Sequence, residues 1–182
     1  MDVSKLTTGE KIAGVSGILL LLIMFIFDWF SVSAAGGLGP SFGGNAWDTM
    51  DLIRWILLLA SLAGIALAIV GAQANEPNMP VALSAITAGL GILGVIFVII
   101  RIISPPDGGL GDLVDVGRDI GVFLGLIAVA GVAYGGWTAM QEEGTSFGDQ
   151  ADRLGGGGGG GQAPPPPPPP SSGAPPSGGT SA

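Results

Sequence analysis

The chain has 182 residues, a formal net charge of −8, and neither cysteine nor histidine. These absences exclude a disulfide-stapled domain, a thiolate or imidazole metal site, and catalysis that depends on Cys or His. Only six residues are Lys or Arg, which argues against nucleic-acid binding.

Composition divides the chain into two kinds of segment. Charged residues make up 11% of the chain, against about a quarter in typical soluble domains. The mean hydropathy is +0.63, although the chain contains 34 glycines and 14 prolines. Apolar residues and loop-forming residues must therefore lie in different segments.

The first apolar stretch covers residues 12–30 and is interrupted only by Asp28. Its length is close to the ~20 residues that a membrane-spanning helix needs. A cleaved signal peptide is the alternative, with Lys5 and Lys11 as its basic region and Val32–Ala34 as its cleavage site. The apolar region is longer than the ~7–15 residues of a signal core, and a charge and two large aromatic residues directly precede that site. The sequence therefore favours a span.

Three further apolar stretches follow, at residues 53–72, 81–103 and 120–139. They are too long for strands, and four strands could not close a membrane barrel. The sequence therefore predicts an all-α, polytopic membrane protein in which an up-down bundle of four transmembrane helices occupies residues 1–140.

Basic residues and the number of spans predict the topology. Lys5 and Lys11 precede the first span, so the positive-inside rule places the N-terminus in the cytoplasm of a cell (plasma or inner) membrane. Four spans return the C-terminus to the same side. The outer loops are then Ser31–Leu52 and Ser104–Asp119.

A polar juxtamembrane segment, 141–154, follows the last span, and a tail of residues 155–182 contains only Gly, Pro, Ser, Ala, Gln and Thr. The tail has no apolar surface to offset the entropy of ordering, so it is predicted to be disordered. Its seven-proline run, Pro164–Pro170, favours polyproline II. Such a run either binds an aromatic groove of a partner protein or acts as a spacer.

Helical spacing places small residues on one face of each span, and such faces normally turn toward the bundle interior in membranes. The predicted packing glycines are Gly14, Gly17, Gly64, Gly91, Gly94, Gly121 and Gly125. Six charged residues continue these faces at the outer end: Asp28, Asp51, Arg54, Arg101, Asp115 and Arg118. They predict an inward charge network that pairs Asp28 with Arg54, and Arg101 with Asp28 or Asp115. The alternative is that these side chains only extend to the membrane interface.

Two patterns resemble ligand sites but occur in the wrong context. Gly89-x-Gly91-x-x-Gly94 matches a dinucleotide fingerprint, yet it lies inside an apolar span without a preceding strand. Asp107, Asp112 and Asp115 do not have the spacing of a calcium loop. We therefore predict no catalytic residue, no cofactor and no metal site.

The run Thr7–Ile12, followed by an apolar helix that ends on Phe27-Asp28-Trp29-Phe30, resembles the start of small uncharacterised four-span membrane proteins of high-GC Gram-positive bacteria. That resemblance implies the four-span fold and carries over no functional residue. We expect a non-enzymatic integral membrane protein of the cell envelope that organises or assists a partner complex through its helices, outer loops or tail. The alternative is a small transporter or channel subunit that uses the inward charges and forms a homo-oligomer.

Overall fold

A computed structural model of the chain describes residues 4, 6–36, 40–73, 81–107, 109, 111–144 and 148. In chain order the elements are α1 (Thr8–Ile26), β1 (Asp28–Ala34), β2 (Phe42–Asn45), α2 (Ala46–Thr49), α3 (Ile53–Gln73), α4 (Val81–Ile103), the 3-10 turn η1 (Gly111–Leu113), β3 (Val114–Arg118) and α5 (Ile120–Glu142). The tail predicted to be disordered, 155–182, lies outside the described residues.

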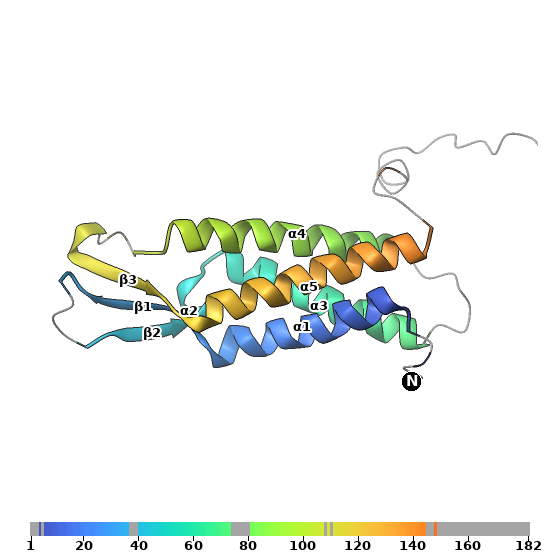
Figure 1. The fold of residues 1–182 in the computed structure, drawn as a ribbon, viewed down its shortest axis with the longest axis horizontal. Coiled ribbons are helices and arrows are strands. Elements are labelled where there is room, and N and C mark those ends of the chain that lie inside the picture. Colours follow the sequence, from blue (N-terminus) through green and yellow to red (C-terminus); the bar gives the residue numbers. More distant parts are fainter. Residues whose placement is uncertain are drawn as a thin grey trace, which may run out of the picture.

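Helices α1, α3, α4 and α5 form a bundle in which successive helices run in opposite directions (Figure 1). Each is long and apolar enough to cross a membrane, which confirms the prediction of a multi-pass membrane protein. Helix α5 packs against α1 and α4, and α3 packs against the same two helices from the other side. Helices α1 and α4 therefore occupy opposite corners of the bundle.

Helix α1 begins and ends four residues earlier than predicted. Its start is set by a capping box: Glu10 N donates to Thr7 Oγ1 at 3.3 Å, and Thr7 N donates to Glu10 Oε2 at 2.8 Å. Phe27 is already extended, and Asp28 starts β1. The predicted first span is present, but its bounds are shifted from about 12–30 because hydropathy alone cannot separate the end of a helix from a strand that continues it.

The seven predicted packing glycines lie at close contacts within the bundle. A Cβ on Gly14 would lie 2.5 Å from Ala68 Cβ, and one on Gly64 would lie 2.6 Å from the carbonyl oxygen of Ala13. A Cβ on Gly91 would lie 2.6 Å from the backbone of Ala133. Backbones that approach this closely leave no room for a side chain, so these contacts require glycine. Gly17 and Gly94 lie at similar helix–helix contacts, whereas Gly121 and Gly125 face residues of β1 and not another helix.

The two segments predicted only as outer loops pair to form a small antiparallel sheet. Its strand order is β2-β1-β3, with Val32 of β1 opposite Phe42 of β2 and Val116 of β3. The sheet extends from one end of the bundle, which we call the sheet end (Figure 1). The opposite end, where α1 begins and α5 ends, is the terminal end. Long-range strand pairing joins segments more than 80 residues apart, so the periodicity of either segment alone did not reveal it.

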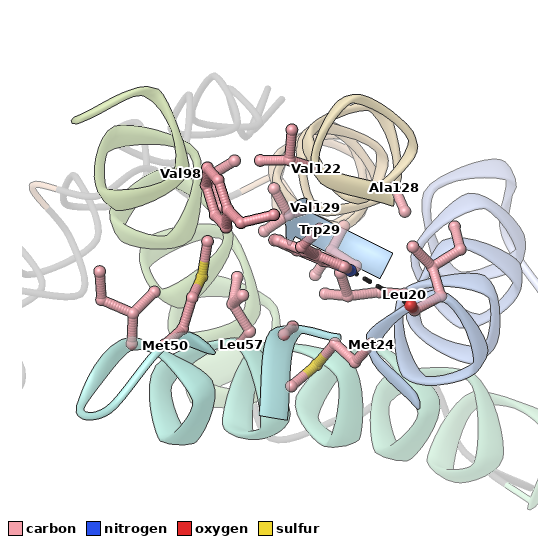
Figure 2. Packing of buried hydrophobic residues seen from close by; sticks show 14 residues of the cluster. Leu20, Met24, Trp29, Met50, Leu57, Val98, Val122, Ala128 and Val129 are labelled. Atoms are coloured by element: carbon pink, nitrogen blue, oxygen red, sulfur yellow. Dashed lines mark hydrogen bonds between the residues drawn. The ribbon is translucent and has the colours of Figure 1, made fainter. Parts of the chain in front are cut away.

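The side chain of Trp29 connects the sheet to the bundle. It is fully buried, and its Nε1 donates to the carbonyl oxygen of Ile23 at 3.2 Å. Its ring lies where a Cβ on Gly121 or Gly125 of α5 would be. Figure 2 shows the ring surrounded by apolar side chains from all four long helices. The neighbouring Phe30 is also buried in this cluster, so two adjacent aromatic side chains fix the first strand to the bundle.

We predict that Trp29→Ala lowers the free energy of unfolding by about 3–5 kcal/mol, because it empties a filled core position. Phe123→Ala, which removes an exposed ring from α5, serves as the matched control and should have a small effect. Unfolding of both purified variants in detergent, followed by helical circular dichroism, measures the difference. Equal losses in the two variants would contradict the role of Trp29.

Candidate functional site

All six residues of the predicted charge network lie toward the sheet end, and Arg54 has the most contacts among them. Its Nη1 donates to the carbonyl oxygen of Trp47 at 2.9 Å. Its guanidinium carbon lies 5.4 Å from the ring centroid of Trp47 and 5.9 Å from that of Trp55. Its buried Nε has no hydrogen-bond partner within the described part of the chain. Arg54 is thus held by two aromatic faces and one backbone oxygen.

Arg118 and Asp115 fasten β3 to its surroundings. Arg118 Nε donates to the carbonyl oxygen of Ile102 at 2.6 Å, which ties the end of β3 to the last turn of α4. Asp115 Oδ2 accepts a hydrogen bond from Gly36 N at 3.1 Å. Both contacts join segments that are far apart in the sequence, so both charges stabilise the position of the sheet.

The other three network residues do not complete the predicted pairs. Asp28 and Asp51 are exposed, and Arg101 is partly buried in the last turn of α4. All six residues are described, and no ion pair joins any two of them. The physical reason is that backbone carbonyls at helix ends and aromatic rings lie within reach of Arg54 and Arg118, whereas exposed carboxylates are solvated by water.

A polar hollow of about 670 Å³ lies between the sheet and the adjoining ends of α1 and α5. Asp28, Ser31, Ser41 and Asp119 supply its polar side chains. Asp119 is the N-cap of α5, but its side chain makes no capping hydrogen bond, and its buried Oδ2 has no partner among the described residues. Its backbone N–H donates to the carbonyl oxygen of Trp29 at 3.0 Å. The hollow is therefore an open polar recess beside the N-terminus of α5, where a carboxylate is favoured by the helix dipole.

Three glutamates gather at the terminal end, and the sequence analysis missed them. Glu10 is only 2% exposed, and its carboxyl group lies beside Gly71 of α3. Glu142 Oε2 accepts a hydrogen bond from Gly9 N at 3.1 Å. Ser84 Oγ donates to Glu143 Oε2 at 2.8 Å. Together these carboxylates connect all four long helices at this end.

Two sequence signals could have revealed this cluster. The first is the T-x-x-E capping box of Thr7 and Glu10, which predicts a carboxylate turned back toward the start of α1. The second is the Glu142-Glu143 pair, which directly follows the last apolar run. Up-down connectivity brings the start of the first helix and the end of the last helix to the same end of the bundle.

The environment of Glu143 raises the pKa of its carboxyl group above the ordinary value. Burial is the largest cause, and the nearby Glu10 and Glu142 carboxylates act in the same direction. The hydrogen bond from Ser84 opposes them. The protonation of Glu143 therefore depends on its surroundings.

We predict that Arg54→Met lowers the free energy of unfolding by about 1–3 kcal/mol, because it removes the contacts to Trp47 and Trp55 and keeps much of the apolar stem. Asp28→Asn should have little effect. In the double variant the two effects should add within about 0.5 kcal/mol. A larger coupling energy in this double-mutant cycle would show that Asp28 and Arg54 interact, as the sequence predicted.

We predict that Glu143 makes the protein less stable as the pH rises. Because its pKa is raised in the folded state, the folded chain binds this proton more tightly than the unfolded chain does. That contribution is present below the ordinary value of 4.5 and is lost as the pH rises through the raised pKa. Glu143→Gln should therefore be more stable than the parent at pH 7, and the difference should shrink toward pH 4.

Thermal unfolding in detergent across this range of pH measures the difference. Asp112→Asn, which removes an exposed carboxylate of η1, is the control for the loss of one negative charge. If Glu143→Gln follows the parent at every pH, burial of Glu143 does not affect its titration.

Comparisons of the chain with protein-family models, with curated proteins and with solved structures find no match. The roles of the sheet end and the terminal end are therefore inferred from their own geometry. The resemblance to four-span proteins of high-GC Gram-positive bacteria stays a prediction.

Proposed function

We propose that the chain is a non-enzymatic integral membrane protein of the cell envelope that holds a partner protein through its outer sheet. The observation that carries this proposal is the fixed position of the sheet. Trp29 anchors β1 in the bundle, and Arg118 ties β3 to α4. A surface that is already ordered loses less conformational entropy on binding than a flexible loop would lose.

The edges of the sheet offer a mode of recognition. With the order β2-β1-β3, the outer edges of β2 and β3 pair with no other strand among the described residues. Such edges can accept an extended segment of another protein through main-chain hydrogen bonds. Phe42 begins β2 and Leu113 directly precedes β3, and each is 72% exposed. These two side chains supply apolar contacts beside the edges.

The proposed orientation places the sheet outside the cell and both termini in the cytoplasm of the plasma or inner membrane. Lys5 precedes α1 in the sequence and Lys11 lies in its first turns. The positive-inside rule favours such basic residues on the cytoplasmic side. The predicted tail, 155–182, would then lie in the cytoplasm and offer the partner complex a second contact from that side of the membrane. Deleting the tail separates its contribution from that of the sheet.

The alternative proposal, a small transporter or channel subunit, finds less support in the bundle interior. Buried apolar side chains such as Leu57, Val98 and Val129 fill the space between the helices toward the sheet end. A polar pathway would therefore have to run between copies of the chain. A native mass of one copy in mild detergent would exclude this alternative.

Site-specific photo-crosslinking in native membranes tests the proposed function. A photoreactive phenylalanine analogue at position 42 or 113 should cross-link one and the same protein, with or without residues 155–182. The same analogue at Ile127, an exposed position in the middle of α5, is the control and should label lipid.

The cross-linked protein should also co-purify with the unmodified chain. Phe42→Ser combined with Leu113→Ser should weaken that association at least fivefold, whereas Ile127→Val should leave it unchanged. Cross-links only to a second copy of the chain would favour the oligomeric alternative. Equal labelling from position 127 and from the sheet would refute the proposal.

A further inference from the structure

An apolar groove of about 440 Å³ lies between α1 and α3, close to the terminal end. Gly14 and Ala68 form its floor, and the larger side chains of Val15 and Ile69 stand beside them. Lys11, in the first turns of α1, lies at one end of the groove. The groove runs along two membrane-spanning helices, independently of the outer sheet on which the proposed function depends.

Small residues create this groove. A Cβ on Gly14 would lie 2.5 Å from Ala68 Cβ, so the helices approach closely and the surface is low at that point. Val15 and Ile69 are exposed and project beyond the floor on either side. A linear hydrocarbon chain matches this shape, because it contacts the floor and both walls along its length.

The occupant of a groove at this depth must be apolar. The surface lining the groove is almost entirely carbon, and water that enters it would lack hydrogen-bond partners. Both helices cross the hydrocarbon layer, in which acyl chains are the surrounding solvent. An acyl chain of a membrane lipid is therefore the occupant that the position of the groove favours.

The charge at the end of the groove selects the headgroup. Lys11 is exposed, and among the described residues that line the groove it is the one charged side chain. The neighbouring Glu10 does not cancel this charge at the surface, because its carboxylate is buried and bound to Thr7 N. Because the charge of Lys11 faces outward near the start of a span, it lies at the level of lipid phosphates.

We propose that this groove binds one acyl chain of an anionic phospholipid whose headgroup lies against the ammonium group of Lys11. A second apolar groove provides a comparison within the same molecule. It lies between α4 and α5, has a volume of about 360 Å³, and is lined by Ile96, Ala130 and Trp137, among other residues. Its described lining contains no charged side chain, so it has no means of selecting a headgroup charge.

Native mass spectrometry of the full chain in mild detergent tests this site. Phosphatidylglycerol and phosphatidylcholine with identical acyl chains are added in equal amounts. The parent should retain phosphatidylglycerol at least threefold more often than phosphatidylcholine. Lys11→Gln, an exposed substitution that keeps the groove, should bring this ratio to about one.

Filling the groove should reduce binding of both lipids. Ala72→Leu places a larger side chain in the lining, and Ile69→Trp at the exposed wall serves the same purpose if the first variant does not fold. Ala130→Leu fills the second groove and is the matched control. It should bind as much of each lipid as the parent, with the same ratio of phosphatidylglycerol to phosphatidylcholine.

A ratio of one in the parent would overturn the proposal, and so would a preference for phosphatidylglycerol that persists in Lys11→Gln. Neither result bears on cross-linking at Phe42, so the two proposals fail independently. If the Ala72→Leu or Ile69→Trp variant retained as much phosphatidylglycerol as the parent, the lipid would have to bind elsewhere on the bundle, and the proposed site would be refuted.

Discussion

The seat of Trp29 against two glycines of α5 is the contact on which the sheet end depends. Because Gly121 and Gly125 have no side chains, the ring enters the bundle between α5, the last of the four long helices, and α1, the first. This position forces the chain to leave helical geometry directly after Ile26 and to continue as an extended strand. That strand becomes the centre of the sheet, so both outer segments take their register from it. The buried aromatic side chain thereby converts two connecting segments into one ordered surface.

Four of the described charged side chains make hydrogen bonds to backbone groups near the ends of the long helices. Arg54 and Arg118 donate to carbonyl oxygens, and Glu10 and Glu142 accept from backbone N–H groups near the start of α1. Charged side chains bind backbone groups here because every helix end leaves unsatisfied donors or acceptors nearby, whereas a side chain of opposite charge is rarely within reach in a chain with few charges. Within the described part of the chain, the two ends of the bundle are therefore ordered without buried ion pairs, which would carry a desolvation cost.

Hydropathy predicted the membrane-spanning part well because a span needs an apolar segment of fixed length. The bounds predicted for α4 agree with the structure, and those for α3 differ by one residue. The start of α1 was missed because a hydrogen-bonded cap determines it, and hydropathy does not detect a cap. The sheet was missed because its pairing depends on two distant segments and on Trp29. Up-down connectivity placed the six charges at one end, whereas helical spacing turned all of them inward. Asp28 and Asp51 are exposed instead, and Asp115 and Arg118 lie in β3. Helical spacing assigns a face and not a partner, so it did not predict the hydrogen bonds of these residues.

The position of α5 has a consequence for the biosynthesis of the chain. Helix α5 contacts both α1 and α4, and its glycines also contact the ring of Trp29, yet among the four long helices described it is the last to leave the ribosome. Its mean hydropathy of 1.8 is the lowest of the four spans, against 2.6 for α4. Until α5 inserts, the faces of α1 and α4 that contact it are uncovered, and Trp29 lacks the two glycines against which its ring packs. Completion of the outer surface is thus delayed to the final step of insertion, and a truncated product would expose no finished sheet to a partner.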